Sequence, residues 1–128
     1  MSRPARPNHG SVALIRQIDE FLERVRDAIL IQRKFDFIPR KENLDGLSEL
    51  GITISAAKQE ILALTYQDYY RGPSPDQSRE HVRVGAIWEF IRDMDGRPVY
   101  IKLKLDNCRG CVCMSFHEAD RAPRLPFR

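Results

Sequence analysis

The sequence lacks any long apolar run, and it contains few cysteines. No stretch approaches the roughly 20 consecutive apolar residues that a membrane-spanning helix needs. The first ten residues, MSRPARPNHG, are positively charged, but no apolar segment follows them, so they do not have the pattern of a secretory signal. We therefore expect a cytoplasmic protein with no membrane partner. Only three cysteines occur in 128 residues, and an odd number in a reducing compartment argues against a disulfide framework.

A clear excess of charge of one sign is also missing. The formal net charge is +3, but three arginines precede the first acid, Asp19, and three follow the last acid, Asp120. Between them, residues 17–120 carry 15 Lys and Arg residues against 18 Asp and Glu residues. Bulk charge therefore gives no argument for a nucleic-acid partner, which would need a local basic surface on an acidic body.

The length and composition fit one compact domain. Hydrophobic residues make up 42% of the 128-residue chain and charged residues 30%, which is typical of a globular protein. We expect residues 1–10 to form a disordered tail, residues 11–120 a single domain, and residues 121–128 a basic C-terminal tail.

The first half of the chain has the periodicity of helices. Apolar residues recur every three or four positions and predict an amphipathic helix from about Ser11 to Gln32, with Ser11 as its N-cap. The sequence KFDFIPR then predicts a short extended segment that ends at Pro39.

Two shorter helices are predicted next. In NLDGLSELG, Asn43 is the expected cap and Gly51 the expected stop. In TISAAKQEILALT the cap is Thr53 or Ser55. Thr65 and Asp68 have the spacing of a capping box, and RGPSPDQSREHVRVG is predicted to be a polar loop.

After that loop the apolar period changes to two. AIWEFIRD, RPVYIKLKLD and CVCMSFH each predict a strand, and Asp95-Gly96 is a strong hairpin turn. Helices followed by strands predict an α+β domain, with a three-stranded antiparallel meander and room for a further short strand. Trp88 is expected in the core and Glu89 on the opposite face. The core face is predicted to include Ile101, Leu103, Leu105, Val112, Met114 and Phe116.

The three cysteines first suggest a metal site. Cys108, Cys111, Cys113 and His117 form the pattern C-x2-C-x-C-x3-H, with ligand types that suit zinc. However, a regular strand separates Cys113 from His117 by about 13 Å, which is too far for one tetrahedral ion. A redox pair is disfavoured as well, since the C-x-x-C does not open a helix of a βαβ unit. The simplest interpretation is that Cys113 is a small residue on a half-buried strand, and we expect no metal and no cofactor.

The face opposite the core carries reactive side chains. It is predicted to display Tyr100, Lys102, Lys104, Ser115 and His117. Lysine binds phosphate, tyrosine stacks on bases, and histidine exchanges protons near neutral pH, so this face could handle RNA. The alternative is that it is only the solvated side of a half-buried sheet.

Two residues at the junction of a predicted helix end and the loop are also candidates. Tyr70 stands at a predicted helix end, where an aromatic residue is usually a packing group. Arg71 follows it at the start of the loop and could serve either a helix dipole or a phosphate.

Four segments in order resemble the MqsR (motility quorum-sensing regulator) family, the toxins of bacterial type II toxin–antitoxin pairs. They are LTYQDYYRGPSPD, IWEFIRDMDGRPVYIKLKLD, CVCMSFHEAD and the final PRLPFR, and the similarity covers roughly residues 15–128. The resemblance implies a RelE-like fold and an mRNA endonuclease, free or ribosome-associated. Such enzymes need no metal, use the RNA 2′-hydroxyl as nucleophile and leave a cyclic phosphate.

The resemblance also implies which residues would act. By motif position the active surface falls on Arg71, Glu89, Tyr100 and His117, with Lys102 nearby; Lys104 and Tyr70 are added as RNA contacts. The best-described members have lysine at the position of Arg71, glutamine at that of Glu89 and lysine at that of His117.

A chemical hypothesis follows for these residues. His117 would be a general acid or base, and Glu89 its opposite or its orienting partner. Arg71 and Lys102 would stabilise the phosphate charge, and Tyr100 would position the scissile phosphate or a base. The expected partners are mRNA and a zinc-ribbon antitoxin of the MqsA/YgiT type. The competing interpretation is a non-catalytic RNA- or protein-binding module that uses the same open face.

Overall fold

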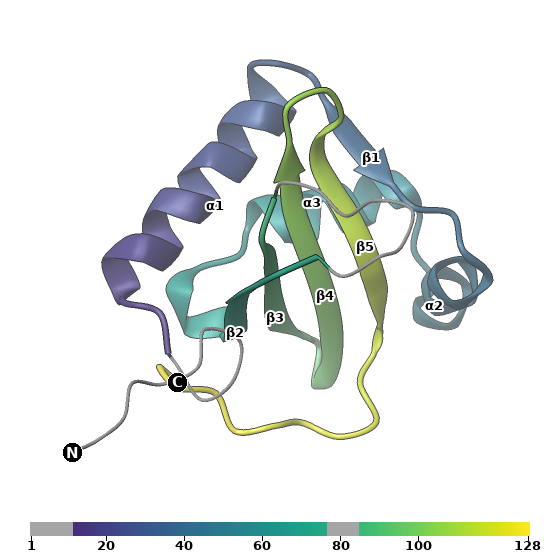
Figure 1. The fold of residues 1–128 in the computed structure, drawn as a ribbon. Coiled ribbons are helices and arrows are strands. Elements are labelled where there is room, and N and C mark those ends of the chain that lie inside the picture. Colours follow the sequence, from purple (N-terminus) through teal and green to yellow (C-terminus); the bar gives the residue numbers. More distant parts are fainter. Residues whose placement is uncertain (1–11, 77–84) are drawn as a thin grey trace.

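The computed structural model describes residues 12–76 and 85–128, which fold into three α-helices and a five-stranded mixed sheet (Figure 1). The sheet order is β1-β5-β4-β3-β2. In chain order the elements are α1 Ile15–Leu30, β1 Phe35–Phe37, α2 Lys41–Leu50, α3 Ile54–Leu62, the 3-10 turn η1 Tyr66–Asp68, β2 Tyr69–Ser74, β3 Ile87–Met94, β4 Arg97–Asp106 and β5 Gly110–Glu118.

The predicted α+β class is confirmed, but the sheet is larger than the predicted three-stranded meander. The three predicted strands are β3, β4 and β5, and they pair antiparallel as expected. β1 adds to the sheet by pairing parallel with β5, and β2 by pairing antiparallel with β3. Parallel pairing between distant segments leaves no local signal in the sequence.

The segment that becomes β2 was predicted as a helix end followed by a polar loop, and this prediction is wrong for Tyr69–Ser74. Pro73 and Gly72 suggested a loop, but a strand at the edge of a sheet tolerates proline because its outer N–H groups have no ladder partner. Tyr69 is fully buried as a result. The rest of the predicted loop, residues 77–84, lies outside the described residues, as do the predicted tail 1–10 and Ser11.

One face of the sheet packs on α1 and α3, and α3 lies behind the strands in the view of Figure 1. The predicted periodicity of α1 is confirmed, because Ile18, Phe21, Leu22, Val25 and Ile29 are all buried. The helix begins later than predicted, at Ile15, where the backbone N–H of Leu14 donates to Gln17 Oε1 at 2.8 Å. Trp88 belongs to this core as predicted, and its ring stacks on Phe21 with centroids 4.6 Å apart.

The hairpin between β3 and β4 turns at Asp95-Gly96, as predicted. Asp95 has a φ of 55° and Gly96 a φ of 86°, the positive values that a tight two-residue hairpin turn requires. Gly96 N–H also donates to Asp93 Oδ1 at 2.7 Å. This turn fixes the register that sets Tyr100 opposite Ile91 and Lys102 opposite Glu89.

A bulge in β5 changes which residues face the core. Lys102 pairs with Ser115 and Leu103 with Cys113, so Met114 is the extra residue on β5. Uniform alternation had predicted Val112 and Met114 on the core face and Cys113 on the other, which is wrong. The bulge instead brings Cys111 and Cys113 into the core, while Phe116 in the core and Ser115 and His117 on the opposite face are as predicted.

Asn43 holds this bulge and does not cap a helix as predicted. α2 begins two residues earlier, at Lys41, and Asn43 lies fully buried in its first turn. Its amide donates to Met114 O at 3.0 Å and to Ile38 O at 2.9 Å, and its Oδ1 accepts from Phe116 N–H at 3.1 Å. The predicted stop at Gly51, the Thr53 cap and the Thr65–Asp68 capping box are all confirmed.

The chain after β5 has no regular secondary structure, yet its end packs on the body of the protein. Leu125 is buried, and the Phe127 ring lies 6.1 Å from those of both Tyr66 and Tyr69. Arg128 forms an ion pair with Asp68. None of the helices in the described part of the chain is long and apolar enough to cross a bilayer.

Candidate functional site

A cavity of about 820 Å³ opens on the sheet face opposite the helical core. Side chains from several elements meet there: α2, the strands β2, β3, β4 and β5, and the C-terminal segment. The residues that matter for its chemistry are Tyr70, Arg71, Tyr100 and His117, with the acids Glu42, Asp45 and Glu49 on the α2 side.

Beside the cavity, the buried carboxylate of Glu89 organises two of these side chains. Glu89 is only 6% exposed. Arg71, its register partner on β2, donates Nε–H to both carboxylate oxygens at 3.0 Å, and the Tyr100 hydroxyl donates to Oε1 at 2.6 Å. Charge-assisted hydrogen bonds of this kind offset the cost of burying a carboxylate. Glu89 therefore orients Arg71 and Tyr100.

Only part of the Arg71 guanidinium is used in its contact with Glu89. Its bonds to Glu89 use Nε alone, and its side chain is 59% exposed. Within the described residues its two terminal amino groups make no hydrogen bond. The guanidinium also lies over the Tyr70 ring, 4.9 Å from the centroid, which holds it in place. A fixed, charged fork that faces a cavity suits a phosphate group.

Tyr100 is held in its protonated form. Burial is the main cause that raises the pKa of its hydroxyl well above the usual value of about 10, and the hydrogen bond and negative charge of Glu89 raise it further. Tyr100 is therefore a hydrogen-bond donor at any physiological pH. A role as a proton-accepting base does not fit it.

His117 is the register partner of Tyr100, and their ring centroids are 5.4 Å apart. Its Nδ1 lies 3.2 Å from the carbonyl oxygen of Glu118. Since a carbonyl only accepts, this contact requires the proton on Nδ1, which leaves Nε2 as the acceptor of the neutral ring. Nε2 lies 3.5 Å from Glu42 Oε2, so a proton taken up there gains an opposite charge beside it.

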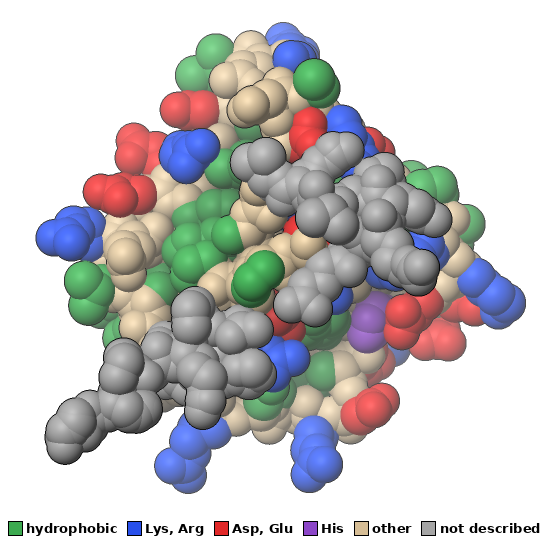
Figure 2. All heavy atoms as spheres, in the orientation of Figure 1, with side chains coloured by type: hydrophobic (Ala, Val, Ile, Leu, Met, Phe, Trp, Pro, Cys, Tyr) green, Lys and Arg blue, Asp and Glu red, His purple; other side chains and the backbone are tan. Residues whose placement is uncertain are grey.

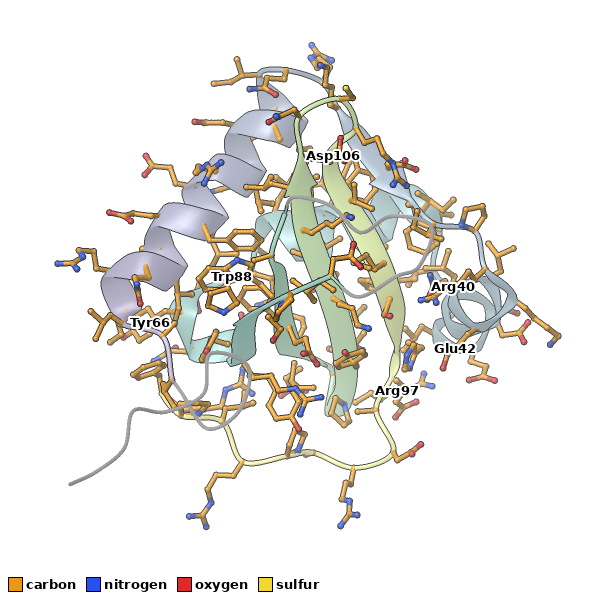
Figure 3. All side chains as sticks on the ribbon, viewed as in Figure 1. Arg40, Glu42, Tyr66, Trp88, Arg97 and Asp106 are labelled. Carbon is orange, nitrogen blue, oxygen red and sulfur yellow. The ribbon has the colours of Figure 1, made fainter. Side chains whose placement is uncertain are left out.

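Close packing of α2 on β5 brings Glu42 to His117. A Cβ on Gly46 would lie 2.5 Å from Phe116 O and 2.8 Å from His117 Cβ, so only glycine allows this approach. Glu42 lies one turn earlier on the same helix. Figure 3 shows Arg40 and Glu42 on the α2 side of β5, and Arg40 also donates to Met114 O in the middle of that strand.

The two lysines that were predicted to contact RNA differ in burial and in ion pairing. Lys102 is half-buried on the site face beside Glu89, and within the described residues its ammonium makes no ion pair. Lys104 is not on an open face, because its side chain is 3% exposed and its ammonium is paired with the equally buried Asp76. Tyr70, the third predicted RNA contact, lines the cavity.

The cysteines lie apart from this site. Cys111 and Cys113 are fully buried in the core, and burial raises the pKa of the Cys111 thiol to about 12. Cys108 is exposed at the β4–β5 turn. In residues 12–76 and 85–128, no three His, Cys, Asp or Glu side chains are grouped so that they could hold a metal ion.

Sequence reasoning missed the contribution of α2 and of the C-terminal segment. Glu42 and Gly46 carry no local signal, since only the docking of α2 on β5 gives them their roles. Arg121 was predicted as part of a tail but lines the cavity.

Charge is distributed unevenly around the cavity. On the α2 side lie Glu42, Asp45 and Glu49, of which Asp45 is paired with Lys41. In Figure 2, red acidic side chains gather at this side, next to the purple histidine. The rest of the lining has Arg71 and Arg121, together with Asp120 and with Glu118, which is paired with Arg97.

No family model matches the chain, and no curated protein and no solved structure matches it significantly.

Proposed function

We propose that the chain is a metal-independent endoribonuclease, the mRNA-cleaving toxin of a type II toxin–antitoxin pair, with a RelE-like fold of the MqsR type. The observation that carries this proposal is the meeting of Arg71, Tyr100 and His117 at one cavity, two of them oriented by the buried Glu89. A charged fork, a fixed hydroxyl donor and a proton acceptor are what transesterification of RNA needs. The proposed setting is the cytoplasm, with mRNA as substrate.

In this mechanism His117 is the general base. Nε2 takes the proton of a ribose 2′-hydroxyl, and the 2′-oxygen attacks the adjacent phosphorus. The bond to the 5′-oxygen breaks, and that oxygen takes a proton from solvent, which leaves a 2′,3′-cyclic phosphate and a free 5′-hydroxyl. Glu42 stabilises the imidazolium that forms, because it lies 3.5 Å from Nε2.

The other side chains stabilise the pentavalent phosphorane. Arg71 lines the cavity, and its terminal amino groups, which do not bond to Glu89, would match the extra negative charge of the phosphate oxygens. The Tyr100 hydroxyl can turn from Glu89 to a phosphate oxygen, and Lys102 adds positive charge on the same sheet face. Glu89 remains an orienting group, so a glutamine there is compatible with the same chemistry.

The acidic side of the cavity favours a second candidate, a binding module for a basic protein segment. Carboxylates of Glu42, Asp45 and Glu49 would attract cationic side chains and repel phosphates. The two candidates differ in product chemistry, since only the nuclease makes a cyclic phosphate.

The test incubates the purified chain and excess EDTA with single-stranded RNA and identifies the new ends by mass spectrometry. We expect 2′,3′-cyclic phosphate ends, with cleavage reduced at least about 100-fold in His117→Ala and about tenfold in Tyr100→Phe. Tyr66→Phe, which changes a tyrosine that packs on Phe127, is the matched control and should cleave normally. Full activity of both site variants would show that the assignment is wrong.

The toxin role has its own test. Induced expression in a bacterium should arrest growth with loss of mRNA, and co-expression of an MqsA/YgiT-type zinc-ribbon antitoxin should restore growth. Normal growth with intact mRNA would favour the binding module. Loss of mRNA in cells together with no cleavage by the purified chain would show that the activity needs the ribosome.

A further inference from the structure

We propose that the RNA strand leaves the cavity over the C-terminal segment, where Arg121 and Arg124 bind backbone phosphates. This inference rests on the proposed nuclease function and adds a strand path to it. Its basis is a pair of neighbouring cavities, two arginines that form no ion pair with any described residue, and the acidic side chains that α2 contributes to the main cavity.

The segment that carries these arginines is fixed at both ends. At its start, Ala119 N–H donates to Pro98 O at 2.8 Å. At its end, Leu125 is buried and Phe127 packs on the rings of two tyrosines. Arg121 and Arg124 therefore project from a held piece of backbone, so that little chain entropy is lost when they bind a ligand.

Two cavities meet beneath this segment. Arg121 lines the cavity of about 820 Å³, and Arg124 lines a second cavity of about 350 Å³. Ile91 and Pro123 line both, so the second cavity continues the first along the chain. A strand whose scissile phosphate lies at Tyr100 and His117 can extend in this direction without leaving the surface.

The charges of the two arginines are available. Arg128, Arg97 and Arg92 are each paired with a carboxylate. Arg121 and Arg124, by contrast, are exposed and make no ion pair within the described residues. In Figure 2, blue side chains project from the lower edge of the molecule, where Figure 1 draws the C-terminal segment in yellow. With Arg71 inside the cavity, Arg121 and Arg124 supply positive charge along the path, whose lining also includes Asp120 and Asp93.

The acidic side chains of α2 set the direction in which the RNA strand runs. Glu42 and Glu49 line the other side of the main cavity, and a phosphate that approached them would be repelled. Beyond the scissile phosphate, the RNA backbone therefore runs towards Arg71 and Arg121 and does not follow α2.

The experiment measures binding of a fluorescent single-stranded RNA of about 12 nucleotides at several salt concentrations, by anisotropy. Every protein carries His117→Ala so that the RNA is not consumed. For R121A/R124A we expect about tenfold weaker binding and a salt slope smaller by about 1.4, since each phosphate contact on a single strand contributes about 0.7. R121K/R124K keeps the charge and should keep most of the slope.

The matched control is R16A/R24A, which removes two exposed arginines from α1 and the same total charge. It should leave the salt slope unchanged. An unchanged slope in R121A/R124A, or an equal loss in both alanine pairs, would overturn the strand path. The nuclease is judged separately by cleavage with His117 intact: if that fails while R121A/R124A still loses slope, the surface binds RNA and only the proposed catalysis is wrong.

Discussion

The two faces of the sheet use alternate residues of the same strands for different purposes. On β3, Phe90 is fully buried against α1, where its ring lies 6.2 Å from Phe21. The adjacent Glu89 is nearly as buried, but on the opposite face, where three hydrogen bonds from Arg71 and Tyr100 surround its carboxylate. One face is held by apolar packing and the other by a small polar network.

This difference shows what each face requires. The core face needs apolar residues of suitable volume, which many sequences supply. The site face needs specific side chains at specific cross-strand positions, because the Arg71–Glu89 and Tyr100–His117 pairs depend on register. Changes on the first face should alter stability, and changes on the second should alter chemistry.

The largest expected effect is on the core face. Phe90→Ala should lower the free energy of unfolding by about 3–5 kcal/mol, because it leaves a cavity beside Phe21 and Tyr69. Urea denaturation followed by circular dichroism measures this loss. Leu44→Ala on α2, where the side chain is 45% exposed, is the control and should change stability by less than about 0.5 kcal/mol. Equal losses would mean that burial does not distinguish the two sites.

The second-largest expected effect comes from a substitution at the β5 bulge, where residues of the two faces are adjacent. Asn43→Ala leaves Phe116 N–H without its Asn43 acceptor and removes one of two donors to Ile38 O, which keeps its hydrogen bond from Arg40 N–H; we expect a loss of about 1–3 kcal/mol. Cleavage by the folded fraction should fall as well, because the bulge sets the position of His117. Lys41→Ala, an exposed neighbour, should affect neither quantity. A stable Asn43→Ala protein with full activity would show that the bulge keeps its conformation without the hydrogen bonds of Asn43.

The bulge also marks where sequence reasoning succeeds and fails. Local signals gave α1, the Asp95-Gly96 hairpin, the Gly51 stop and the core position of Trp88, since each depends on neighbours in the chain. The facing of Cys113 and the role of Asn43 depend on contacts across about 70 residues, which no local period encodes. The meeting of Arg71, Glu89, Tyr100 and His117 could be proposed from motif order and strand alternation. The place of Glu42 beside His117 and the burial of Lys104 could not be proposed from these signals.

On the site face, Glu89→Gln should lower the rate of cleavage and leave the free energy of unfolding almost unchanged. Glutamine keeps the shape and one acceptor, so Arg71 and Tyr100 remain near their positions but lose the charge that holds them. We expect cleavage to fall about tenfold while the unfolding free energy changes by less than about 1 kcal/mol, because Arg71 is largely exposed. Single-turnover cleavage and urea unfolding measure the two quantities. A loss of several kcal/mol without a loss of activity would reverse the assignment of Glu89 to the site.

The smallest expected effect concerns the pKa of the Tyr100 hydroxyl and distinguishes the two causes that raise it. Burial and the Glu89 carboxylate both raise its pKa, and the carboxylate adds a hydrogen bond as well as a charge. A group whose folded-state pKa is raised contributes stability that is complete below the unfolded value of about 10 and is lost as the pH rises towards the folded value. Stability should therefore be constant at neutral pH and fall above about pH 10. The buried thiol of Cys111 adds a similar loss that begins nearer pH 9.

Replacing Glu89 with glutamine removes only the contribution of the carboxylate, so the Tyr100 pKa should fall while remaining above 10, because burial is the larger cause. Tyrosinate absorbance across an alkaline titration measures this shift. Subtracting the curve of the corresponding Tyr100→Phe protein isolates the signal of one of the four tyrosines. No shift would mean that Glu89 does not hold the Tyr100 hydroxyl in solution and that burial alone raises the Tyr100 pKa.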